Sequence, residues 1–134
     1  MPAVANGQMY MRFTLLRRNR DSKRKEGLLL AAHELRDNAD LTVAEHRELR
    51  ELLAWFNVNL NHPACLKEPG NHRALSWFKP QAKKPLGHMW RLVEILRRHD
   101  VETEVHKTRD PGIVLYEDGW QVVAKPKKGA RVSW

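Results

Sequence analysis

The sequence has few of the features that mark secreted and membrane proteins. Cys65 is its only cysteine, so no intramolecular disulfide framework can form, and a lone thiol is typical of a reducing compartment. Its apolar runs, such as residues 28–32, are far shorter than the ~20 residues that a membrane span needs, and the amino terminus has no apolar segment followed by a cleavage site. We therefore expect a soluble, cytoplasmic protein with no membrane partner.

The sequence also lacks the common catalytic and cofactor motifs. It contains no glycine-rich phosphate loop, no Gly-x-Ser-x-Gly elbow, and no Cys-x-x-Cys or His-Glu-x-x-His pair. His62, Cys65 and His72 do lie close together in sequence, but zinc requires a fourth ligand or an open water position, and seven histidines make such coincidences common. We therefore expect no cofactor and no metal site.

Positive charge exceeds negative charge and is unevenly distributed. The chain has 24 Lys and Arg against 16 Asp and Glu, a net charge of +8 and a pI near 10.0, which favours polyanionic partners. Residues 1–25 have seven basic and one acidic residue, and residues 63–100 have eight and three. Residues 26–62, with three basic and seven acidic residues, are acidic instead. The positive charge is thus concentrated in two segments.

Hydrophobic periodicity predicts the elements of the first half. Residues 9–16 alternate between apolar and polar, as a half-buried strand does, and residues 31–37 favour a short helix. Thr42 followed by Glu45 is a capping box, which predicts a longer helix that ends by Asn61.

The second half has one helical pattern followed by alternating ones. Residues 73–79 predict a short helical turn, and Pro85 suits the start of an amphipathic helix. The apolar stripe of that helix is expected to contain Leu86, Met89, Trp90, Val93 and Leu96. Beyond Asp100 the period changes to two, which predicts three strands, near residues 101–106, 113–116 and 120–124.

This order of elements predicts an α+β fold. We expect an antiparallel sheet of about four strands with helices packed on one face. At 134 residues, the chain has the usual size of one domain, so residues 1–134 should form a single domain. Three segments are expected outside the core: a flexible tail at 1–8, a basic loop at 17–25 and a basic tail at 127–134.

Two Trp-Phe pairs, at residues 55–56 and 77–78, mark where the core is expected. Three blocks of sequence together resemble a small family of uncharacterised bacterial hypothetical proteins: Trp55-Phe56-Asn57 with Leu60 and Pro63, Ser76-Trp77-Phe78-Lys79, and Pro111-Gly112 followed by Tyr116-Glu117-Asp118 and Gln121-Val122-Val123-Ala124. The resemblance covers roughly residues 26–126. It implies a compact bacterial domain and, because the family has no established activity, assigns no functional residue.

The basic segments predict a non-enzymatic module that binds nucleic acid or associates with a nucleoprotein complex. Lysine and arginine neutralise phosphates, and an exposed aromatic ring can stack on a base. Trp77 and Trp90 are near the basic residues in sequence, although both are expected to be buried. RNA is slightly favoured over DNA because no helix-turn-helix or zinc-finger spacing is visible. The predicted nucleic-acid-binding residues are Arg17, Arg18, Arg20, Lys23, Arg24, Lys25, Lys79, Lys83, Lys84, Arg91, Arg97, Arg98, Lys127 and Lys128.

Two alternatives stay open. The chain can be a protein-interaction or regulatory domain whose basic charge is incidental. It can also be a metal-dependent nuclease, with carboxylates at Asp100, Glu102 and Glu104 and an assisting Lys107. Alternating charge on an exposed strand face is the simpler explanation of those residues, and we favour it over the nuclease site. The sequence does not indicate the oligomeric state.

Overall fold

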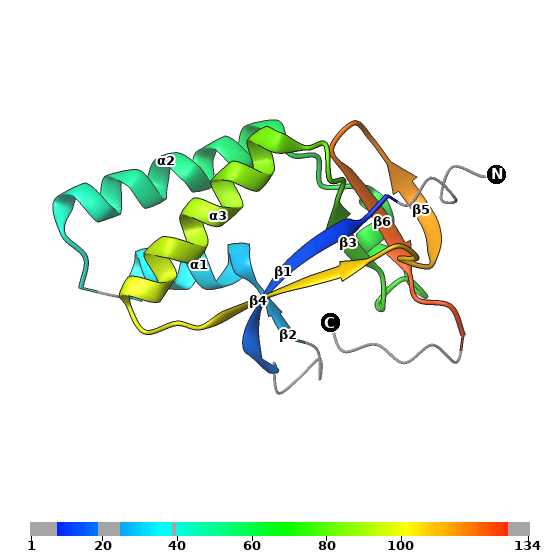
Figure 1. Ribbon diagram of the computed structural model, residues 1–134, viewed down its shortest axis with the longest axis horizontal. Coiled ribbons are helices and arrows are strands. Elements are labelled where there is room, and N and C mark those ends of the chain that lie inside the picture. The colour runs from blue at the N-terminus through cyan, green and yellow to red at the C-terminus, as the bar shows by residue number, and fades with distance from the viewer. Residues whose placement is uncertain (1–7, 19–24, 39, 129–134) are drawn as a thin grey trace. The chain divides into compact units, whose positions relative to one another are not determined.

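The computed structural model describes residues 8–18, 25–38 and 40–128. Over these residues the protein is α+β, as predicted (Figure 1). It contains three α-helices, α1 (Leu28–Asn38), α2 (Val43–Asn59) and α3 (Lys83–Arg98), and a short 3-10 helix, η2 (Ala64–Lys67). The described residues also form six strands: β1 (Tyr10–Arg18), β2 (Lys25–Gly27), β3 (Leu75–Phe78), β4 (Thr103–Thr108), β5 (Ile113–Glu117) and β6 (Gln121–Lys125).

The six strands belong to one open sheet with the order β2-β1-β3-β6-β5, in which β4 also pairs with β1. The pairs along this path are antiparallel; for example, Met11 of β1 lies opposite Phe78 of β3, and Ser76 of β3 lies opposite Val123 of β6. The three carboxy-terminal strands are confirmed. They do not form a continuous meander, however, because β4 pairs with β1 rather than with β5.

Two of the predictions about the strands are wrong. The sheet has six strands among the described residues rather than about four, and residues 73–79 contain β3 instead of a helical turn. Leu75, Trp77 and Phe78 are all buried, and β3 pairs with β6 over four residues. Aromatic side chains fit a pleated, buried surface well, so the pairing with β6 determines the conformation of this short run.

Both ends of the predicted basic loop at 17–25 belong to strands. β1 continues to Arg18, and β2 begins at Lys25. Residues 19–24, between the two strands, lie outside the described residues, as do residues 1–7 of the predicted amino-terminal tail and residues 129–134 of the predicted carboxy-terminal tail.

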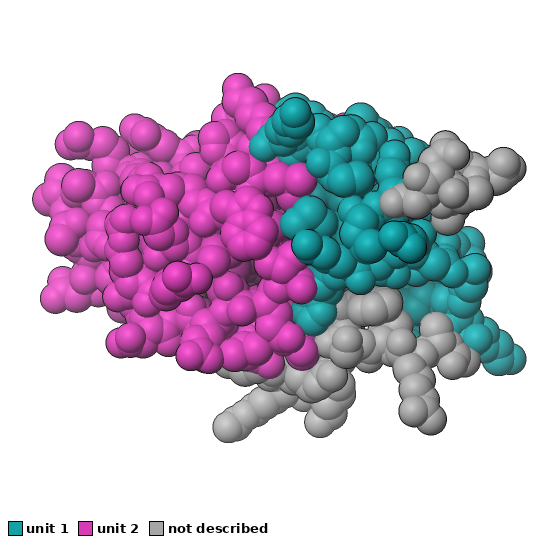
Figure 2. Space-filling model, viewed as in Figure 1, with its two compact units in different colours: residues 1–12, 62–83, 106–134 teal, residues 13–61, 84–105 magenta. Residues whose placement is uncertain are grey.

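The chain divides into two compact units (Figure 2). Unit 1 contains residues 1–12, 62–83 and 106–134, and unit 2 contains residues 13–61 and 84–105. β1 and β4 contribute residues to both units. In unit 1, Tyr10, Leu75, Trp77 and Val122 form a buried cluster, whereas the core of unit 2 consists mainly of the apolar faces of α1, α2 and α3.

In unit 2, α2 and α3 run antiparallel. Glu45, near the start of α2, contacts His99 just beyond the end of α3, whereas Trp55, near the end of α2, contacts His88 in the first half of α3. The predicted capping box of α2 is confirmed. Thr42 Oγ1 accepts a hydrogen bond from the backbone N–H of Glu45 (3.1 Å), and the Thr42 backbone N–H donates to Glu45 Oε1 (3.4 Å).

In unit 1, Asp118 stabilises the connection between β5 and β6. Its Oδ1 accepts hydrogen bonds from the backbone N–H groups of Trp120 (2.8 Å) and Gln121 (3.0 Å), and its Oδ2 accepts one from the hydroxyl of Tyr116 (2.8 Å). Burial alone would raise the pKa of Asp118, but these donors stabilise the charged form and lower the pKa below its ordinary value. Residues 118–120 thus join β5 and β6 into an antiparallel hairpin.

Gly112 enters β5 in a conformation that only glycine adopts readily. Its φ is +114°, and a Cβ atom there would lie 2.1 Å from the backbone oxygen of Lys125. We predict that Gly112→Ala lowers the free energy of unfolding by about 2–3 kcal/mol, because it combines a strained backbone with a backbone clash. Urea denaturation followed by circular dichroism measures this loss.

Gly87→Ala is the matched control. Gly87 lies in α3 with no atom within 4 Å of an added Cβ, so alanine should raise the free energy of unfolding by about 0.5–1 kcal/mol through its better helix propensity. Equal effects of the two substitutions would show that the conformation at Gly112 is not constrained.

Candidate polyanion-binding pocket

The candidate site is an open pocket of about 640 Å³ in unit 2, between α1 and α2. One side is formed by α1 and the other by a single face of α2. Its lining is polar and mainly basic, and it consists of His33, Arg36, Arg47, Arg50, Glu51, Leu53, Ala54 and Asn57.

The pocket is basic because α2 carries its opposite charges on different faces. Glu45 and Glu48, three residues apart, are directed toward α3, where Glu48 forms an ion pair with Arg91 and Glu45 contacts His99 (3.2 Å). Arg47 and Arg50 share the same spacing on another face and line the pocket. Glu45 and Glu48 therefore do not neutralise Arg47 and Arg50, and Glu51 is the one acidic residue of α2 that shares the face of these arginines.

The cations of the pocket are only partly compensated. Among the residues that the structure describes, Arg47 and Arg50 are exposed and form no ion pair. Arg36 bonds Asp37 through its Nε (2.8 Å), which raises the pKa of Arg36 and lowers that of Asp37; both side chains remain in solvent. Glu51 is the one carboxylate in the lining. Three guanidiniums thus face one carboxylate of the lining, Glu51, and only Arg36 has a carboxylate partner outside it, Asp37.

This arrangement suits a ligand with phosphate groups. A guanidinium presents several N–H donors in a rigid plane that matches two oxygens of a phosphate or carboxylate at once. The volume lies within the range of about 300–1,000 Å³ that is usual for small-ligand sites, which leaves room for a nucleotide unit. Leu53 and Ala54 add a limited apolar surface.

Five of the predicted nucleic-acid-binding residues are engaged in ion pairs within the protein. Lys25 pairs with Glu104, Lys79 with Glu117, Arg98 with Glu94, and Lys127 with Asp110, while Arg91 contacts both Glu48 and Glu94. The Lys79 side chain is also largely buried. A cation held by an internal carboxylate is less available to a phosphate, so these five contribute less than their charge suggests.

The remaining predicted residues fall into three groups. Lys83, Lys84, Arg97 and Lys128 are exposed and form no ion pair among the described residues; Lys83 and Lys128 belong to unit 1, and Lys84 and Arg97 belong to unit 2. Arg17 and Arg18 end β1, and Arg20, Lys23 and Arg24 lie outside the described residues. None of the predicted residues lines the pocket between α1 and α2.

Trp77 and Trp90 were both expected to be buried, and the structure confirms this for only one of them. Trp77 is buried, as expected. Trp90 is not on the buried stripe of α3: 47% of its surface is exposed, and its ring meets the ring of Phe13 edge to face at 5.0 Å. The buried stripe runs through Met89, Val93 and Leu96 instead, and position 90 lies one residue around the helix from it.

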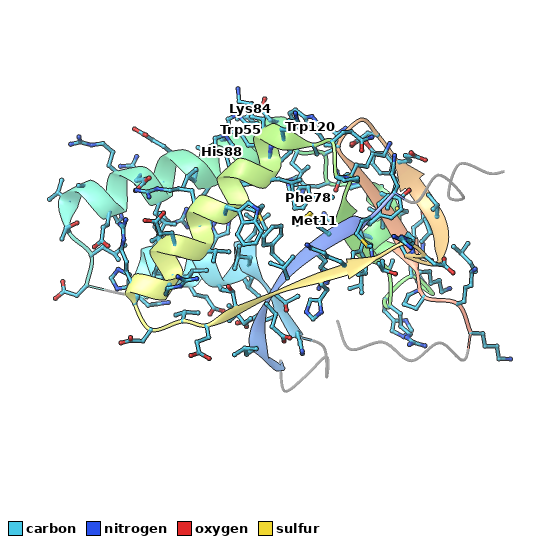
Figure 3. The ribbon with its side chains drawn as sticks, viewed as in Figure 1. Met11, Trp55, Phe78, Lys84, His88 and Trp120 are labelled. Carbon is cyan, nitrogen blue, oxygen red and sulfur yellow. The ribbon has the colours of Figure 1, made fainter. Side chains whose placement is uncertain are left out.

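Trp55 of α2 forms a cluster with Lys84 and His88 of α3 in unit 2 (Figure 3). Its ring lies 4.5 Å from the His88 ring, and Lys84 Nζ lies 5.8 Å from its centre. Lys84 and His88 are one helical turn apart. The Nε2 atom of His88 is buried and has no hydrogen-bond partner among the described residues. Burial and, secondarily, the charge of Lys84 lower the pKa of His88.

The described residues contain no group of three or more His, Cys, Asp or Glu side chains placed to hold a metal ion. Of the carboxylates considered for a nuclease, Glu104 is paired with Lys25. Asp100 has a φ of +62°, in the turn after α3, and Glu102 is exposed. Asp100 thus lies in a turn, Glu102 lies just before β4, and Glu104 lies within β4.

No protein-family model, curated protein or solved structure matches this chain. In the part of the chain that the structure describes, no helix is long and apolar enough to cross a membrane.

The net charge of each segment of the chain does not predict this pocket. Residues 26–62 are acidic overall, yet Arg36, Arg47 and Arg50 meet within that segment. The signal that reveals them is the helical spacing of Arg47, Arg50, Ala54 and Asn57, which places them on a face of α2 that Glu45 and Glu48 do not share.

We predict that His88 titrates below the ordinary value of about 6.5 for a histidine, because its ring is partly buried beside Trp55. Lys84→Gln should raise the pKa of His88 by only part of this difference, since burial is the larger cause. Proton NMR of the imidazole resonances across the pH range measures both values. Lys83→Gln, which changes the neighbouring lysine, should leave the titration of His88 unchanged; a His88 pKa above the ordinary value would contradict the packing described here.

Proposed function

We propose that this protein is a non-enzymatic module that binds single-stranded nucleic acid, with RNA slightly favoured over DNA, either free or within a nucleoprotein complex of the cytoplasm. The observation that carries the proposal is the pocket between α1 and α2, where Arg36, Arg47 and Arg50 face one carboxylate, Glu51. Binding is by phosphate contact and is weakly dependent on sequence.

The shape of the site favours a single strand over a DNA duplex. A DNA duplex presents its phosphates on a rigid, convex backbone, and the elements that read its sequence enter a groove. Here the basic side chains lie in the lining of a recess, and a flexible single strand can bring its phosphates into such a recess. Asn57, at the edge of the same face of α2, adds an amide that can donate to a phosphate or base.

Exposed cations outside the pocket add to the attraction of a polyanion. Lys84 and Arg97 belong to the same unit as the pocket and have no internal ion pair among the described residues. Long-range attraction from such residues raises the rate of association with a polyanion and is screened by salt. The pocket supplies the fixed contacts, and these residues add to the surrounding positive potential.

We predict salt-dependent binding of a labelled single-stranded RNA of about ten nucleotides. Three arginine–phosphate contacts correspond to a slope of log K against log salt concentration of about −2, since each contact contributes about −0.7 for single strands. Affinity should therefore fall by about tenfold or more between 50 and 200 mM salt. The double substitution Arg47→Gln and Arg50→Gln should make the slope less steep by about 1.4. Fluorescence anisotropy measures these values.

The matched control is Arg73→Gln with Arg109→Gln. Both residues are exposed, and neither lines the pocket, so this variant loses the same net charge without changing the site. It should keep a slope close to that of the unmodified protein. An equal loss in both variants, or a flat slope in the unmodified protein, would overturn the proposal. Tight binding of an acidic peptide with no binding of RNA would indicate the protein-interaction alternative instead.

A further inference from the structure

Trp90 is a large aromatic side chain that the fold leaves open to solvent. It lies on α3 with 47% of its surface exposed, whereas Met89, its neighbour in sequence, and Val93, three residues later, are both buried. A single exposed apolar residue is ordinary on a protein surface. An indole, however, is the largest flat surface that one side chain can present, and its surroundings here favour contact with a particular class of molecule.

The indole of Trp90 is held in place by a residue of the core. Phe13 of β1 is 3% exposed, and its ring meets the Trp90 ring edge to face, with 5.0 Å between the ring centroids and 83° between the ring planes. In such a contact the edge of one ring is directed at a face of the other. Whichever ring supplies the edge, at least one face of the indole is not covered by Phe13.

The turn of α3 that precedes Trp90 leaves space beside the indole. Helical side chains lean toward the amino terminus of their helix, so the neighbours of Trp90 on that side are Gly87 and Leu86, three and four residues earlier. Leu86 is buried, and Gly87 has no heavy atom within 4 Å of an added Cβ. The helix therefore places no side chain over the solvent side of the indole at position 87.

Arg97 provides positive charge on the same side of α3. It lies seven residues after Trp90, which is nearly two full turns and about 10 Å along the helix axis. Arg97 is exposed and forms no ion pair among the described residues. The carboxylate between them, Glu94, is bonded by both Arg91 and Arg98, so its charge is compensated. The surface next to the indole thus suits a polyanion better than an acidic or neutral partner.

We propose that Trp90 stacks on a base of the single-stranded nucleic acid that binds at the pocket, with Arg97 contacting an adjoining phosphate. Every base has a flat π face, so a stacking contact of this kind tolerates any sequence. The ion pair between Glu48 and Arg91 joins the immediate neighbours of Arg47 and Trp90, and a strand of about ten nucleotides is long enough to contact both. This inference rests on the proposed function and adds to it a contact that does not depend on charge.

Fluorescence anisotropy with a labelled RNA of about ten nucleotides, at several salt concentrations, tests the inference. Trp90→Ala should weaken binding by about 5- to 150-fold, the loss of one stacked base, and should leave the salt slope unchanged because no charge is removed. Trp90→Phe keeps an aromatic ring and should retain most of the affinity. Trp120→Ala, which removes a partly exposed tryptophan of unit 1, is the matched control and should bind like the unmodified protein. Full affinity in Trp90→Ala, or equal losses in Trp90→Ala and Trp120→Ala, would overturn the inference.

An abasic strand decides the case if Trp90→Ala does not fold. A strand of the same length without bases keeps its phosphates but cannot stack. In protein labelled with fluorotryptophan, the fluorine NMR signal of Trp90, identified by its loss in Trp90→Phe, should shift during titration with RNA and stay constant with the abasic strand. A constant Trp90 signal while RNA binds with the expected salt slope would contradict the stacking contact alone. No binding of RNA at all would overturn the proposed function, and this inference with it.

Discussion

The contacts of Arg91 with Glu48 and Glu94 determine which carboxylates of α2 and α3 are held in ion pairs within unit 2. Arg91 lies on α3 and reaches Glu48 of α2, while Glu94 also binds Arg98 (2.9 Å). These carboxylates raise the pKa of Arg91 still further above its ordinary value, so its charge is fixed. Together with the contact between Glu45 and His99, they hold Glu48 and Glu45 toward α3, whereas Glu51 lies in the lining of the pocket.

The basic side chains of α2 are consequently left on a different face. Arg47 and Arg50 are separated from Glu45 and Glu48 by the helical turn, and they meet Arg36 of α1 across the pocket. The site thus depends on where the carboxylates of α2 are bound and not on the net charge of the segment. An exposed ion pair contributes little to stability, but here its direction decides which cations remain available.

Local signals predicted the helices well, and long-range pairing limited the rest. Thr42 and Glu45 are three residues apart and define the start of α2 without any help from distant residues. The prediction for β3 was wrong because four residues show no clear period, and its conformation depends on pairing with β6, from Phe78 opposite Gln121 to Leu75 opposite Ala124. Trp90 was predicted on the buried stripe of α3 but lies one position around the helix from it. Apolar composition alone does not show which of two neighbouring apolar residues is buried. The pocket requires α1 and α2 to be placed in space, so charge counted along the chain did not reveal it.

The most direct test of the account is NMR of the arginine side-chain Nε–H groups during titration with a short single-stranded RNA. The signals of Arg47 and Arg50 should shift first, because their guanidiniums have no carboxylate partner among the described residues. The signal of Arg91, held by Glu48 and Glu94, should stay constant. A shift of Arg91 before Arg47 and Arg50, or no shift of the pocket arginines at saturating RNA, would contradict the claim that these helix faces determine what the protein binds.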